Sequence, residues 1–166
     1  MNFFSRRDST AIRRYSRPMA SRFFRIGRAV TGLGMFATKP IKRGTAIATY
    51  RGPRITTAEA DRLEKRGATY LYTLNKDWTI DGSPRWNVAR YINHSCKPNA
   101  RPVTRQGRIV IVADRRIEPD EEITYHYGDE YLQWFIEDGG GCKCAACRRK
   151  RTRRRRRARL KGKKKK

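Results

Sequence analysis

The chain has 166 residues, enough for one domain and little more. Lys and Arg number 41 against 15 Asp and Glu, so the formal net charge is +26. No apolar run approaches the ~20 residues that span a membrane, and the N-terminus lacks the apolar stretch of a secretory signal. We therefore expect an intracellular protein without a membrane anchor. An organellar transit segment is the alternative, because the N-terminus is rich in Arg and Ser and poor in acidic residues.

The positive charge is concentrated at the two ends of the chain. Residues 148–166 hold fifteen basic residues and no acidic one, and residues 1–30 hold eight Arg and one Asp. Residues 31–147 carry a net charge of only +4. Runs of like charge repel and bury no apolar surface, which predicts disordered arms at 1–20 and 148–166. Such arms favour non-specific nucleic-acid binding through phosphate neutralisation. A solubility tail or a nuclear-targeting signal is the alternative reading.

The first half of the chain predicts short strands and one helix. Residues 22–26 and 34–37 are expected to be short strands around a glycine-containing turn, and residues 45–50, in which β-branched and apolar side chains alternate, are expected to form another strand. The segment from Thr56 to Glu59 fits a capping box that opens a helix. This helix should end near Arg66, with Gly67 as its C-terminal stop. Residues 69–74 and 78–80 are then expected to be strands.

The second half is predicted to be mostly strand as well. Gln106-Gly107 turns the chain into residues 108–113, the strongest strand signal present. A turn at Pro119-Asp120 precedes a strand at 122–125, and residues 131–136 suit a short helix. Many short strands with few helices predict a mostly-β domain.

The four cysteines suggest a metal site. They are Cys96, Cys142, Cys144 and Cys147. Four thiolates satisfy a tetrahedral zinc ion, and three at C-x-C-x2-C spacing can surround one ion from a short loop. Such a zinc site would join distant parts of a small domain. Unrelated free thiols or redox disulfides are the alternative.

Four ordered motifs stand between residues 21 and 147. They are Gly32-Leu-Gly-Met-Phe-Ala37 with Ile41-Lys-Arg-Gly44, Arg90-Tyr-Ile-Asn-His-Ser-Cys-Lys-Pro-Asn99, Glu121-Glu-Ile-Thr-Tyr-His-Tyr-Gly128, and the cysteine segment 142–147. In this order they resemble the SET-domain protein lysine methyltransferases. The resemblance implies a SET β-fold with several small sheets, few short helices and a knotted C-terminal segment. It places the SET domain at 21–138 and a zinc-binding post-SET segment at 139–147. No cysteine cluster precedes the SET domain, so a minimal, bacterial-type member is expected.

The resemblance also implies the residues that bind S-adenosylmethionine, the methyl donor of the family. A glycine pair alone is a weak motif, although a backbone without Cβ atoms can approach a ligand closely. A lone histidine in a polar loop is by itself more typical of a structural group. The positions that match cofactor contacts are Gly32, Leu33, Gly34, Tyr70, Arg90, Asn93 and His94. The family likewise places the cysteine of Asn93-His-Ser-Cys96 at a zinc ion with the post-SET cysteines.

Three tyrosines are expected to carry the chemistry. Methyl transfer to a lysine needs a neutral amine, whereas an exposed lysine of pKa ~10.4 is almost wholly protonated. An apolar aromatic channel disfavours the ammonium form, and tyrosine hydroxyls can orient the amine. By motif matching, Tyr127 is the catalytic tyrosine, Tyr125 tunes the number of methyl groups added, and Tyr50 lines the channel. Without the resemblance, aromatic core packing would be the preferred reading of all three.

The sequence departs from the family pattern at three points. Two residues separate the last two cysteines, where four are common in the family. This shorter spacing affects the expected coordination geometry of the zinc ion. His126 replaces a common Asp and, by strand alternation, should point away from the channel. No aromatic residue follows Cys147 to close over the cofactor, so either Trp134 or Phe135 takes that place or no aromatic residue does.

These observations predict an S-adenosylmethionine-dependent protein lysine methyltransferase. Its expected substrate is a lysine in a basic or nucleic-acid-associated protein, and methylation of its own tail is compatible with this. The alternative is a catalytically idle SET fold that binds DNA or RNA through its basic arms. The expected location is the cytoplasm or nucleoid in a bacterium, or the nucleus in a eukaryote or an infected host. The sequence leaves the oligomeric state open.

Overall fold

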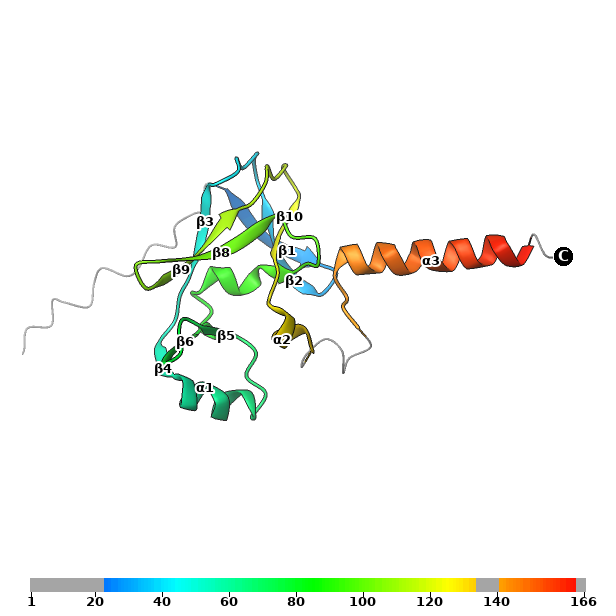
Figure 1. Cartoon of the computed structure of the whole chain (residues 1–166). Helices are drawn as coiled ribbons and strands as arrows, with labels where there is room; N and C mark the ends of the chain where they lie inside the picture. Colours follow the sequence, from blue (N-terminus) through cyan, green and yellow to red (C-terminus); the bar gives the residue numbers. More distant parts are fainter. Residues whose placement is uncertain (1–22, 134–140, 164–166) are drawn as a thin grey trace, which may run out of the picture.

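The fold consists of small sheets around one core, as a computed structural model describes it for residues 23–133 and 141–163 (Figure 1). The first sheet has the strand order β1 (Phe24–Ala29), β2 (Gly32–Ala37), β10 (Glu122–Tyr125), β7 (Asn93–His94). The second has the order β3 (Ala46–Tyr50), β9 (Arg108–Ala113), β8 (Ala100–Arg105). The third has the order β4 (Arg54–Thr56), β6 (Trp78–Asp81), β5 (Leu71–Thr73). The predicted mostly-β fold is confirmed.

The helices are few, and two of them are short. They are α1 (Thr57–Glu64), the 3-10 helix η1 (Val88–Tyr91), α2 (Asp129–Leu132) and α3 (Ala145–Lys163). The predicted helix start is confirmed, because the Thr56 side chain accepts the N-cap bond of the capping box from the Glu59 amide at 3.2 Å. The short helix predicted at 131–136 begins earlier, at Asp129, and Trp134 and Phe135 lie outside the described residues.

The core is built mainly from isoleucines of the strands and of the segments between them. Its large apolar side chains that are fully buried include Met35, Ile41, Ile92, Ile109, Ile111, Ile117 and Ile123. The predicted turn before β9 is present, with both Gln106 and Gly107 at positive φ. An antiparallel β8–β9 hairpin follows from it.

Two of the sequence motifs meet in one parallel strand pair. Thr124 of β10 lies opposite Asn93 of β7, and Tyr125 lies opposite His94. A parallel pair needs a crossover connection, and here residues 95–121 supply it. This pairing places the histidine loop beside the tyrosine strand. The knotted path expected for the C-terminal segment stays a prediction, because residues 134–140 are outside the described range.

The C-terminal basic segment differs from the sequence expectation of a disordered tail. Residues Ala145–Lys163 form the straight helix α3, which extends away from the domain (Figure 1). Arg, Lys, Ala and Leu, which make up most of it, are all good helix formers. The Arg151 guanidinium donates to the Cys142 carbonyl at 2.7 Å and so fixes the first turns of α3 to the cysteine segment. Helix propensity and this anchor outweigh the like-charge repulsion. The predicted N-terminal arm lies outside the described residues.

None of the described helices combines the length and the apolar character that a membrane crossing requires.

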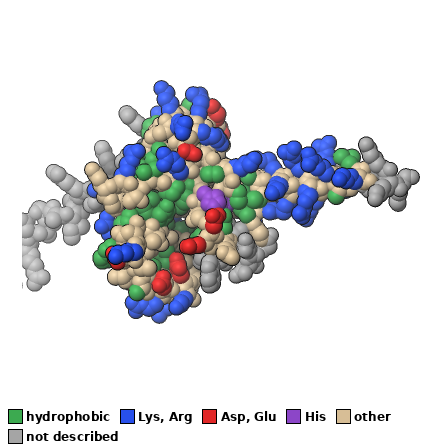
Figure 2. All heavy atoms as spheres, in the orientation of Figure 1, with side chains coloured by type: hydrophobic (Ala, Val, Ile, Leu, Met, Phe, Trp, Pro, Cys, Tyr) green, Lys and Arg blue, Asp and Glu red, His purple; other side chains and the backbone are tan. Residues whose placement is uncertain are grey.

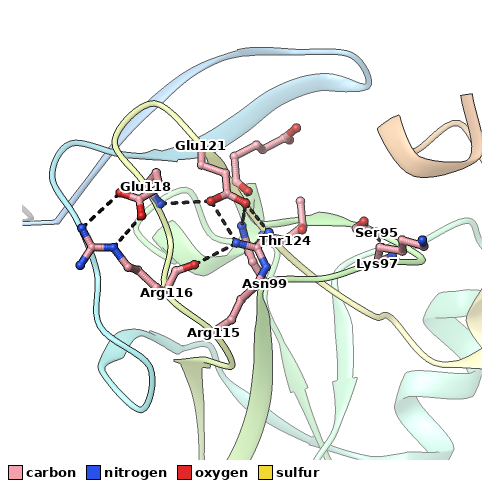
Figure 3. Close-up of polar contacts among 9 residues, drawn as sticks. Ser95, Lys97, Asn99, Arg115, Arg116, Glu118, Glu121 and Thr124 are labelled. Carbon is pink, nitrogen blue, oxygen red and sulfur yellow. Dashed lines mark hydrogen bonds and ion pairs between the residues drawn. The ribbon is translucent and has the colours of Figure 1, made fainter. Parts of the chain in front are cut away.

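A buried asparagine locks the loop after β7 to β10 (Figure 3). The Asn99 amide donates to the Glu122 carbonyl at 2.8 Å and to Glu121 Oε1 at 3.0 Å, and it accepts from the Thr124 amide at 2.8 Å. Arg115 pairs with Glu121 from the outer side. Although partial burial acts in the opposite direction, the bonds from Arg115 hold the pKa of the Glu121 carboxyl below its usual value. The loop that carries His94 and Cys96 is thereby held in place.

The substitution Asn99→Ala should lower the free energy of unfolding by about 2 kcal/mol or more, because it leaves buried backbone groups without partners. Urea unfolding measures this. Asn75→Ala is the matched control: the Asn75 side chain also bonds to two backbone groups, accepting from the Asp77 and Trp78 amides, but in an exposed turn where water can replace it. An equal loss in the two variants would contradict the proposed lock.

Candidate active site and metal centre

One large cavity of about 1530 Å³ collects the residues that the sequence analysis selected. Its walls come from β2, α1, β5, η1, β7, β10, α2 and the cysteine segment. The predicted site residues that line it are Gly32, Leu33, Tyr50, Tyr70, Arg90, Asn93, His94, Tyr125 and Tyr127. Two cysteines of the predicted metal site, Cys142 and Cys144, also line it. Residues that are spread over more than a hundred positions of the sequence thus line the same cavity.

The cavity is lined by seven of the eight tyrosines in the chain. The rings of Tyr125 and Tyr127 lie 4.9 Å apart, and those of Tyr127 and Tyr131 lie 5.0 Å apart. Tyr72 packs 5.3 Å from Tyr50. Three of these tyrosines were not among the predicted site residues: Tyr72, Tyr91 and Tyr131. Tyr72 stands two residues after Tyr70 in a predicted strand, and this spacing places both on one face.

The Tyr127 hydroxyl is held by the backbone. It donates to the Ile92 carbonyl at 2.8 Å, and the ring packs edge-on against His94 at 5.5 Å. Burial and the neighbouring Tyr131 raise the pKa of Tyr127, so the hydroxyl keeps its proton at neutral pH. Since its hydrogen points to Ile92, the oxygen lone pairs can accept a hydrogen bond from another group.

The Tyr50 hydroxyl shapes another part of the wall. It donates to the Tyr70 carbonyl at 2.9 Å, which fixes the segment before β5. A Cβ atom at Gly82 would lie 2.3 Å from this hydroxyl, so the approach requires glycine there. Tyr50 is therefore a wall residue whose hydroxyl is already bonded to backbone.

Arg90 holds a polar atom without a partner. Its guanidinium lies 4.0 Å from the centre of the Tyr70 ring and donates to the Ser83 carbonyl. Its Nε is the one buried side-chain nitrogen or oxygen, within the described part of the chain, that has no hydrogen bond. A buried guanidinium donor beside a cavity suits a ligand carboxylate. S-adenosylmethionine carries such a carboxylate, and its adenine suits the aromatic walls.

Glycine is favoured at the two positions of the β2 pair for two separate reasons. Gly32 lies at φ +111, a conformation that favours glycine. A Cβ at Gly34 would lie 2.7 Å from Glu122 Oε1, so its neighbours in the chain require glycine there. The Asn93 amide donates to the Leu33 carbonyl at 3.0 Å and to Glu122 Oε1 at 2.7 Å. Gly32 and Leu33 line the cavity, whereas Gly34 packs behind them.

The four cysteines converge at the junction of the β7 loop and α3. Cys96 Sγ lies 3.7 Å from Cys142 Sγ and 3.5 Å from Cys147 Sγ. Ligands at ~2.3 Å from a tetrahedral zinc are about 3.8 Å apart, so these distances fit the ion. Although burial acts in the opposite direction, amide donors from Cys96 and Cys147 lower the pKa of Cys144 to about 7. The residues therefore fit zinc, with two rather than four residues between the last two cysteines.

His94 competes with Cys147 as a ligand, since its ring nitrogen and the Sγ atoms of Cys96, Cys142 and Cys144 lie within 4.8 Å of one another. Its Nδ1 accepts from the Tyr127 amide at 3.4 Å, so its proton belongs on Nε2, 3.2 Å from Cys96 Sγ. Burial, and secondarily His126, lower the pKa of His94 to about 4. A neutral His94 then donates to Cys96, and the four-cysteine ligand set stays a prediction.

His126 is not among the cavity-lining residues, which agrees with its predicted direction. Its ring nevertheless packs 5.0 Å from the ring of His94, so it supports the wall from behind.

The comparisons with known proteins agree with this arrangement. The model of the SET domain matches residues 32–128, and the chain belongs to the SET-domain family. It is 37% identical over 132 residues to a histone-lysine N-methyltransferase, H3 lysine-4 specific, of Emericella nidulans; the match covers 72% of this chain and 11% of that protein. It is also 37% identical over 135 residues to human histone-lysine N-methyltransferase 2D, covering 72% of this chain and 2% of that protein.

A solved structure has a similar fold. A chain of ctPRC2, in an autoinhibited conformation and bound to S-adenosylmethionine, superimposes with a TM-score of 0.59 at 29% identity. The match covers 66% of this chain and 16% of that chain. The present chain therefore corresponds to a small part of each of these relatives.

Proposed function

We propose that the chain is an S-adenosylmethionine-dependent protein lysine N-methyltransferase. The observation that carries this proposal is the single cavity in which the Arg90 guanidinium, with its unpartnered Nε, and the Tyr127 hydroxyl both stand on the wall. The printed names of the relatives, which are histone-lysine methyltransferases, and the S-adenosylmethionine-bound neighbour support the same reaction class.

When bound, S-adenosylmethionine supplies a methyl group on a positively charged sulfonium. The tyrosine walls remove water from the lysine amine, which favours its neutral form. The Tyr127 oxygen accepts one N–H of that amine and aims the nitrogen lone pair along the cavity, because its own hydrogen is held by Ile92. With the cofactor bound, the nitrogen would take the methyl carbon as the carbon–sulfur bond breaks, and its surplus proton would leave to solvent. Arg90 and Asn93 bind the S-adenosylmethionine molecule itself.

The rim of the cavity favours a cationic substrate. Four exposed carboxylates from two helices line it, Asp61, Glu64, Asp129 and Glu130, and they outnumber its two exposed lysines, Lys65 and Lys143. Figure 2 shows acidic side chains gathered on this face of the domain, below the histidine, while basic side chains cover much of the remaining surface. Charge complementarity at the rim favours a lysine within a basic segment. A basic protein, in a chromatin-like or other nucleic-acid-associated setting, is therefore the proposed substrate class.

A binding titration and a transfer assay test the proposal together. Titrating S-adenosylmethionine into the full, zinc-containing chain should show one site, and radiolabelled methyl should enter a lysine-rich peptide. A peptide with the same lysine between acidic residues is the matched control and should accept less label. Cofactor binding without transfer to any basic protein would favour the idle module. Absence of cofactor binding would remove the proposed function altogether.

Tyr125 should limit the number of methyl groups added. It lies 4.9 Å from Tyr127 on the same wall and is buried, so its hydroxyl occupies the space that a methylated amine needs to turn. We expect mainly monomethyl-lysine from the unmutated chain and a shift to di- or trimethyl-lysine in Tyr125→Phe, read by mass spectrometry. Trimethyl-lysine as the main product of the unmutated chain would contradict this role.

A further inference from the structure

A second concave surface lies between α3 and the loop that follows β7. Its volume is about 1030 Å³. No carboxylate among the described residues lines it, and its Lys and Arg side chains are Lys97, Arg149, Lys150, Arg153, Arg154, Arg157 and Lys161; Cys96 and Cys147 of the cysteine centre line its inner end. We name this surface the basic groove. No salt bridge in the described part of the chain joins an α3 side chain to a carboxylate, so no acidic side chain pairs with this charge.

The helix that forms one wall of the groove is fixed at its first turns. The Arg148 amide donates to the Cys144 carbonyl at 3.0 Å, and the Cys147 amide donates to Cys144 Sγ at 3.4 Å. A helix N-terminus disfavours nearby cations, but a cluster of four thiolates around zinc carries a net charge of −2 there. The cysteine centre therefore stabilises the start of α3 and sets its direction.

The charge distribution on α3 identifies the partner by its chemistry. Twelve of its nineteen residues are Lys or Arg and none is acidic. They surround the helix, whereas binding to a membrane surface requires an apolar face, and Leu160 is the one large apolar residue of α3. A long cationic helix face suits a phosphate strand at the edge of the major groove of duplex DNA, a groove that admits an α-helix.

The spacing along the groove agrees with this partner. Arg149, Arg153, Arg157 and Lys161 recur every four residues and lie on one side of α3. At 1.5 Å per residue they span about 18 Å. One DNA strand presents a phosphate every ~3.4 Å of helix axis, so this row faces about five phosphates.

We propose that the basic groove is a binding site for the phosphate backbone of duplex DNA, without base specificity. The cysteine centre fixes the direction of α3 and so the orientation of this site. This differs from the disordered basic arm expected from the sequence, because one face of α3 contributes more than the other. The inference does not depend on methyl transfer.

The test compares two triple variants of the full, zinc-containing chain. Arg153, Arg154 and Arg157 face the groove, and Arg148, Arg155 and Arg159 lie on the opposite side of the helix by the 3.6-residue period. Each triple is changed to Gln, so charge and residue type are matched. Fluorescence anisotropy with a mixed-sequence DNA duplex over a salt series should show roughly tenfold weaker binding for the groove triple than for the control triple. The groove triple should also lower the slope of log K against log salt by about 2.7.

Circular dichroism, zinc content and S-adenosylmethionine affinity establish that both variants are folded. Equal losses in the two triples would overturn the proposal, because a generic polycation has no preferred face. Tighter binding to an RNA hairpin, or to polyglutamate, than to duplex DNA would overturn the choice of partner.

Discussion

Replacing Tyr127 by phenylalanine should lower kcat by about 100-fold or more, while S-adenosylmethionine binds with nearly unchanged affinity. The hydroxyl, held by the Ile92 carbonyl at 2.8 Å, is the group that we propose to orient the amine. Its loss removes a contact made to the reacting nitrogen, so the effect falls on kcat. Single-turnover methyl transfer and a cofactor titration measure the two quantities separately.

Tyr72→Phe is the comparison variant for this prediction. It removes a hydroxyl from the same cavity, on a ring that packs against Tyr50. Its loss of kcat should be much smaller. Methyl transfer by Tyr127→Phe at the unmutated rate would show that the tyrosine has a packing role alone.

Zinc removal should affect the cavity as well as the C-terminal segment. We expect about one zinc per chain by elemental analysis, and Cys147→Ser should weaken its retention under chelation. Because Cys142 and Cys144 line the cavity, loss of the ion should lower S-adenosylmethionine affinity by about an order of magnitude.

The control for the zinc prediction is Ala146→Ser, which changes a residue between the cysteines and keeps every thiol. It should retain the ion and bind the cofactor normally. Freshly purified, reduced protein without zinc would refute the assignment of the centre.

Local signals predicted most of the fold. The capping box at Thr56, the turn at Gln106-Gly107 and the apolar run of β9 each depend on neighbouring residues, and all are present. The strand β8 was missed because it is an edge strand, where Pro102 and alternating polar residues are tolerated. The helix α3 was missed because its composition indicates repulsion, whereas its anchor at Cys142 is a contact that composition does not reveal.

The candidate site was predicted as far as the motifs extend. The selected residues apart from Gly34 meet at the cavity or at the cysteine centre. Tyr131 and Tyr91 were missed because no local pattern separates a cavity tyrosine from an exposed one. The three hydrogen bonds of the Asn99 side chain, likewise, depend on strand pairing, which the sequence does not state.

The rigidity of α3 has a geometrical consequence. A flexible basic tail would let the domain sample all directions around a DNA contact, and its effect would be a raised local concentration of substrate. A helix of about 28 Å that starts at the cysteine centre instead holds bound DNA at a fixed distance from that centre. Since Cys142 and Cys144 also line the cavity, the distance between the DNA and the cavity is fixed as well. Only lysines that lie at one distance and in one direction from the bound duplex would reach the cavity and be methylated. Chemically equivalent lysines elsewhere would be left unmodified.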